Sequence, residues 1–123
     1  MKRLLMGVAL ALVAASPAAA DSVSSRYDDA VQEAEAGANR LKDADWQFRD
    51  GNPREGCALM EQARVHYEQA YRDLQAMDQM VNDPAGGYSA DDRERTMTWI
   101  HQQQETLNPI GAKMADTYHS TCQ

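Results

Sequence analysis

Apolar residues recur at intervals of three and four in three stretches of the chain, and no stretch alternates apolar and polar residues. The three-and-four spacing lines up side chains on one face of an α-helix, whereas strict alternation would indicate a strand. The pattern therefore predicts an all-α protein with three amphipathic helices. Because the stretches between them are short, we expect a small antiparallel three-helix bundle.

The first two helices have clear boundaries in the sequence. The first is expected from about Ser25 to Arg49, and Gly51 is a natural stop because glycine tolerates positive φ. The second is expected to begin with Asn52 as its N-cap and Pro53 in its first turn, and to end near Val81. Its core stripe consists of Cys57, Met60, Ala63, Tyr67, Ala70, Leu74, Met77 and Val81.

The third helix is expected to begin at Ser89 and carries an interrupted stripe. Met97, Ile100, Leu107, Met114 and Tyr118 share one face, on which Gln104 and Gly111 also fall. Pro109 lies inside this segment, and proline lacks a backbone donor and clashes with the preceding turn. We therefore expect the third helix to be kinked near Pro109, or split there with a short fourth helix following.

The two cysteines of the chain, Cys57 and Cys122, are expected to form a disulfide. In an up-down-up bundle the start of the second helix and the end of the third lie at the same pole. From the helical rise per residue, the third helix is roughly 12 Å longer than the second helix between that pole and the opposite one. A kink at Pro109 or fraying is expected to absorb the difference.

The N-terminal segment has the composition of a secretory signal peptide. Lys2 and Arg3 precede an apolar run, and Ala18, Ala19 and Ala20 fit a cleavage site. The prediction is a signal peptide over residues 1–20 and one helical domain over residues 21–123. The apolar run is too short to span a bilayer, so we expect an exported protein, periplasmic or extracellular, without a stable membrane anchor after cleavage. Export to an oxidising compartment agrees with a disulfide.

The charge and the motifs limit the classes of function. A formal net charge of −7 makes nucleic acid an unlikely partner, because phosphate backbones bind basic surfaces. We find no catalytic constellation and no phosphate-binding loop, and we expect no cofactor and no enzymatic activity. Met97, His101 and Glu105 follow one another at intervals of one turn and could ligate a transition metal. The alternative is a solvated polar face beside a core methionine.

Both tryptophans, Trp46 and Trp99, lie off the predicted stripes. Large aromatic residues outside a core can mark a partner surface, although loops or the N-terminal segment could equally cover them. The sequence therefore predicts a small exported interaction or structural module without catalysis, which binds a protein partner or itself through Trp46 and Trp99. The alternative is a ligand-binding protein that holds a transition metal through Met97, His101 and Glu105.

Overall fold

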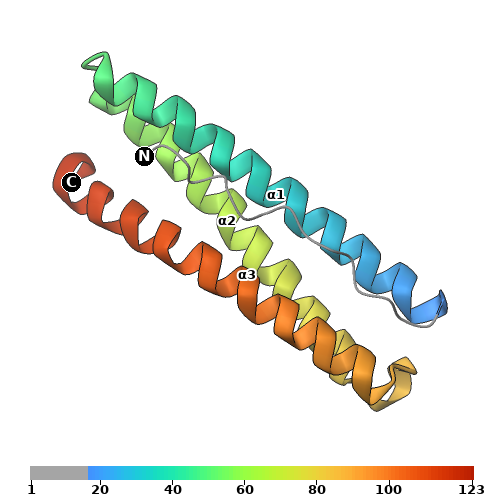
Figure 1. The fold of residues 1–123 in the computed structure, drawn as a ribbon. Helices are drawn as coiled ribbons and strands as arrows, with labels where there is room; N and C mark the ends of the chain where they lie inside the picture. The colour runs from blue at the N-terminus through green and yellow to red at the C-terminus, as the bar shows by residue number, and fades with distance from the viewer. Residues whose placement is uncertain (1–16) are drawn as a thin grey trace.

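The computed structural model describes residues 17–123, and its long elements are all helical. The order of elements is α1 (Pro17–Arg49), α2 (Pro53–Asn82), a short 3₁₀ turn η1 (Pro84–Gly86), α3 (Ala90–Thr117) and a π-helical turn η2 (Tyr118–Cys122). Figure 1 shows the three helices running alternately up and down, with α2 between α1 and α3. The predicted all-α, antiparallel three-helix bundle is confirmed, and residues 17–123 contain no strand.

The first helix is longer than predicted, because α1 begins at Pro17 rather than near Ser25. Alanine is the best helix former, and three alanines follow Pro17. Val23, which precedes the expected start, is buried within the hydrophobic core and anchors this extension. Most of the predicted signal peptide, residues 1–16, lies outside the described residues. Within residues 17–123, none of the helices combines the length and the apolar character that crossing a membrane requires.

The residues predicted from the sequence to bound the first two helices lie at the turn between α1 and α2. Gly51 adopts a φ of 80° after α1, and Pro53 occupies the first turn of α2. Asn52 does not cap α2 through its side chain, which instead donates to Gln47 Oε1 at 3.1 Å. The predicted N-cap position of Asn52 is confirmed, but its side-chain amide is engaged by the preceding helix instead of capping α2.

Small residues allow α1 and α2 to approach closely. The shared face carries buried alanines from both helices: Ala30, Ala34, Ala38, Ala44, Ala63 and Ala70. Gly37 allows close contact with a core aromatic residue, because a Cβ atom placed there would lie 2.9 Å from Cε2 of Tyr67. The closest packing in the bundle therefore lies between α1 and α2, and α3 packs more sparsely against this pair.

Replacing Gly37 by alanine is expected to destabilise the fold by about 1–3 kcal/mol, as overpacking of a dense core does. The new methyl group would lie within 3 Å of the buried ring of Tyr67, so the ring would have to shift from its packed position. The matched control is Gly111→Ala in α3, where a Cβ atom meets nothing within 4 Å. That change should stabilise by up to about 1 kcal/mol through helix propensity. Urea denaturation of both variants measures the difference, and equal midpoints would contradict the tight seam.

The register between α2 and α3 follows from three cross-links at matching intervals. They are the Cys57–Cys122 disulfide, the Tyr71–Asn108 hydrogen bond and the contact of Asn82 Nδ2 with Met97 Sδ at 3.4 Å. Successive links lie fourteen and then eleven residues apart on both helices. Since α2 ends at Asn82, the first turns of α3 project beyond it. The greater length of the third helix is thus an overhang at the pole opposite the disulfide.

The split expected as one alternative at Pro109 was wrong, whereas a kink there stays a prediction. α3 continues as one α-helix from Ala90 to Thr117 with Pro109 inside it, and only the π-helical turn η2 follows. Pro109 is exposed, and so is Glu105, whose carbonyl oxygen loses its helical donor. Water can satisfy that carbonyl oxygen, so the helix tolerates the proline. The overhang also removes the need for a kink to bring the cysteines together.

Candidate ligand groove between α2 and α3

A groove between α2 and α3 has a volume of about 580 Å³. It lies between two of the cross-links that set the register. The Cys57–Cys122 disulfide, whose Cα atoms are 5.7 Å apart, lies beyond one end of the lining, and the hydrogen bond from the Tyr71 hydroxyl to Asn108 Oδ1 lies at the other end. The two helices are therefore pinned on either side of the groove.

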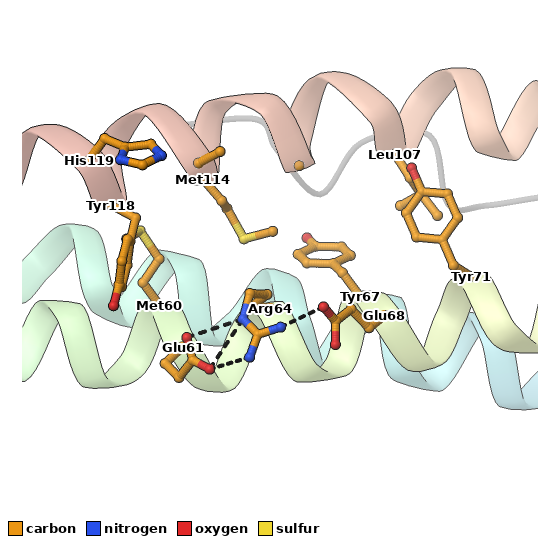
Figure 2. A pocket seen from close by; sticks show the side chains of 12 residues that line it. Met60, Glu61, Arg64, Tyr67, Glu68, Tyr71, Leu107, Met114, Tyr118 and His119 are labelled. Atoms are coloured by element: carbon orange, nitrogen blue, oxygen red, sulfur yellow. Dashed lines mark hydrogen bonds and ion pairs between the residues drawn. The ribbon is translucent and has the colours of Figure 1, made fainter. Parts of the chain in front are cut away.

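The floor of the groove is apolar. It is formed by buried side chains from both helices, namely Met60, Tyr67, Leu107 and Met114. Gly111 supplies the space, because it lies on the groove-facing side of α3 and has no side chain to fill it. In Figure 2 the thioethers of Met60 and Met114 reach into the groove from opposite helices. The arrangement suits an apolar ligand held between two flexible methionines.

One polar atom lies within this apolar floor. The hydroxyl of Tyr67 is buried and has no hydrogen-bond partner. Burial raises the pKa of Tyr67 to about 12, so the phenol keeps its proton at neutral pH. Its ring lies against Gly37 of α1, and Figure 2 shows it between the two walls of the groove. The hydroxyl is therefore a fixed donor without an acceptor.

The exposed rim of the groove carries a cluster of three charged residues on α2. Arg64 Nε donates to both carboxylate oxygens of Glu61, at 3.1 and 3.2 Å, and Arg64 also pairs with Glu68 (Figure 2). Hydrogen bonding from Arg64 lowers the pKa of Glu61. The cluster carries one positive and two negative charges, so its field is weakly negative and disfavours an anionic ligand.

The two tryptophans, which were predicted to share one partner surface, differ in their burial. Trp46 is 58% exposed and remains available for a partner. Trp99 is only 7% exposed, and its ring centroid lies 5.0 Å from that of Tyr27 on α1. The expectation that Trp99 lies off the core was wrong, because α3 is rotated so that Trp99 faces the other helices. Trp99 is therefore a core residue, while partner binding by Trp46 stays a prediction.

The residues of the alternative metal site are placed on α3 without forming a ligand cluster. His101 and Glu105 are exposed, whereas the sulfur of Met97 accepts from Asn82 in the contact between α2 and α3. Across residues 17–123, no group of three His, Cys, Asp or Glu side chains is arranged to hold a metal ion. The transition-metal site at Met97, His101 and Glu105 therefore stays a prediction, in which the sulfur of Met97 is already engaged by Asn82.

A second polar feature lies on the opposite side of α2. Asp73 is buried beneath Arg26 and Gln69, which donate to its Oδ1 at 3.5 and 3.3 Å. Burial raises the pKa of Asp73, and the carboxylate of Asp29 adds to the shift. These residues also line a shallow polar cleft. The cleft has no apolar floor, so we assign the candidate site to the groove between α2 and α3.

Sequence reasoning missed the groove, although one signal was present. Gly111 falls on the predicted apolar stripe of the third helix, where a larger residue would be expected. Comparison with known protein families, with curated protein sequences and with solved structures gives no match for this chain. The class that the geometry defines is therefore a disulfide-linked three-helix bundle with an apolar groove, and its function is argued from that groove.

Proposed function

We propose that this chain is an exported, non-catalytic binding module whose groove between α2 and α3 holds a small apolar ligand. The observation that carries this proposal is an apolar groove whose ends are fixed by the Cys57–Cys122 disulfide and the Tyr71–Asn108 hydrogen bond. Its volume of about 580 Å³ falls within the range of roughly 300–1,000 Å³ that small-molecule sites occupy. Pinned walls also reduce the ordering that binding would otherwise require.

We assign no reaction to the groove. Its carboxylates, Glu61 and Glu68, are engaged with Arg64. Tyr67 keeps its proton because burial raises its pKa to about 12. Nucleophilic catalysis would need a nucleophile within hydrogen-bonding reach of a base, and the residues that line the groove offer no such pair. Binding is the function that these side chains support.

Export and a protein contact complete the proposal. Export is supported by the signal-like composition of residues 1–20 and by the disulfide, since disulfides persist in oxidising compartments. Trp46 is kept as the contact residue for a protein partner or a second copy, because it is the most exposed of the large apolar side chains described. It lies on α1, which contributes no residue to the lining of the groove.

Filling the groove provides the direct test. Gly111→Phe places an aromatic ring where the groove is open, and we expect it to abolish binding of the neutral apolar dye N-phenyl-1-naphthylamine. The fold should tolerate the change because a Cβ atom at Gly111 meets nothing within 4 Å. The matched control is Ala112→Phe, which adds the same ring at the next, exposed position. Fluorescence titration and circular dichroism measure binding and folding.

Two results would contradict the proposal. Dye binding that survives equally in both phenylalanine variants would place the dye outside the groove. A wild-type protein that leaves the dye fluorescence unchanged at high protein concentration would show that the groove does not hold an apolar ligand of this size.

A further inference from the structure

We propose that the groove selects uncharged single-chain amphiphiles, and that the buried hydroxyl of Tyr67 donates a hydrogen bond to an ester or ether oxygen within the ligand. This inference rests on the proposed function and names the ligand class.

The hydroxyl of Tyr67 is an unsatisfied group inside an otherwise apolar surface. A buried donor without a partner lowers the stability of a fold, whereas phenylalanine would fill the same space without that penalty. The sequence nevertheless places a tyrosine here, at 4% exposure and with no partner for its hydroxyl among the described residues. A ligand oxygen that accepts this hydrogen bond accounts for the residue.

The position of the donor constrains where the ligand carries its oxygen. Apolar side chains lie on both sides of Tyr67 along the groove: Met60 and Met114 toward the disulfide, and Leu107 toward the Tyr71 end. An acceptor bonded to Tyr67 must therefore be flanked by hydrocarbon, as an ester or ether oxygen is. In Figure 2 the Met114 side chain reaches into the groove on the side where Tyr67 carries its hydroxyl. Its flexible thioether can move aside when a ligand enters.

The shape and the charge of the groove narrow the class further. The groove lining on α2 runs from Met60 to Tyr71, eleven residues along the helix, which corresponds to roughly 17 Å. Such a long space suits one extended chain. The rim presents two carboxylates to one guanidinium, and Arg64 is engaged by both Glu61 and Glu68. The groove lining also includes His119, whose Nδ1 contacts Gln123 Oε1 at 3.0 Å. A ligand carboxylate would find no unpaired guanidinium at the rim and would face two carboxylates, so a neutral ester is preferred over the corresponding fatty acid.

The test compares three probes that share a decyl-length chain, each kept below its aggregation concentration. They are 1-decanoylglycerol, which is a neutral ester, decanoate, which is an anion, and decyltrimethylammonium, which has no acceptor oxygen. Methyl-labelled methionines report the site by NMR, because Met60 and Met114 line the groove while Met77, Met80 and Met97 do not. We expect the ester to shift the two groove methyls selectively and to bind more tightly than decanoate.

The decisive variant is Tyr67→Phe, with Tyr118→Phe as its matched control. Tyr118 also lines the groove but is 42% exposed, so water can replace its partners. Tyr67→Phe should weaken binding of the ester roughly 3- to 10-fold and leave the ammonium probe unaffected. Its urea midpoint should be unchanged or higher than that of the wild type. A purely structural role for the hydroxyl would instead lower the midpoint.

Each remaining outcome decides against one part of the argument. Equal affinity of Tyr67→Phe and wild type for the ester would overturn the assigned donor and leave the binding groove standing. Tighter binding of decanoate than of the ester would overturn the preference for uncharged ligands. If the apolar dye binds but none of the three probes moves the groove methyls, the ligand class is wrong. If the dye also fails to bind, the proposed function falls with it.

Discussion

Replacing both Cys57 and Cys122 by serine is expected to lower the free energy of unfolding by roughly 4 kcal/mol, because the disulfide closes a long loop of the unfolded chain. The two cysteines are 65 residues apart in sequence. The effect should be large for this bundle, since α3 packs only sparsely against the other helices and borders the open groove beside the disulfide. Chemical denaturation of the double variant and the wild type gives the difference.

The reduced wild-type protein is the control for this experiment. It retains both cysteine side chains, so it should lose nearly the same stability as the double serine variant. Hydrogen exchange should show the greatest loss of protection in the last turns of α3, next to Cys122. Identical denaturation midpoints with and without reductant would mean that noncovalent packing alone holds α3 in place.

Trp99→Ala is expected to cost about 3–5 kcal/mol of folding stability, the range for removing a large aromatic side chain from a core. Trp99 is buried, and its ring packs against Tyr27 of α1. It therefore joins α3 to α1 at the end of the bundle away from the disulfide. Losing this contact leaves a cavity that the sparse α1–α3 packing cannot close. Thermal and urea denaturation measure the loss.

Trp46→Ala provides the matched comparison, because it removes the same side chain from an exposed position on α1. Its effect on unfolding should stay within about 0.5 kcal/mol. Sedimentation of the same variant tests the proposed partner surface, where self-association in the wild type should weaken. Similar stability losses in both tryptophan variants would contradict the different burial of the two side chains.

The periodicity of the sequence was sufficient to predict the helices but not the rotation of the third one. The predicted stripe of that helix included Met97 and Tyr118 and left Trp99 outside. The buried side chains of α3 are Thr96, Ile100, Gln103, Leu107, Ile110 and Met114, at intervals of three and four, together with Trp99 beside Ile100. Ile100, Leu107 and Met114 belong to both patterns. Because Thr96 and Gln103 are polar, hydrophobicity alone favoured the neighbouring face.

The disulfide could be predicted because it depends on only two residues and on the direction of the helices. The greater length of the third helix was explained incorrectly from the sequence. The register between α2 and α3, which places the extra length at the pole opposite the disulfide, is set by contacts such as Tyr71–Asn108. This hydrogen bond joins residues 37 positions apart, and no periodic pattern in the sequence indicates that the two residues meet. The groove was missed for a related reason. It arises from an absence of side-chain volume at Gly111, combined with cross-links on either side.

The disulfide also gives the chain the topology of a closed ring. α2, the connecting segment with η1, and α3 form one covalent circle from Cys57 to Cys122, whereas α1 joins that circle as a tail. A peptide bond cut between Asn82 and Ala90 would leave α2 and α3 connected through sulfur, with the groove between them. The connecting segment is consequently the place where the backbone can be interrupted or lengthened at least risk to the ligand site.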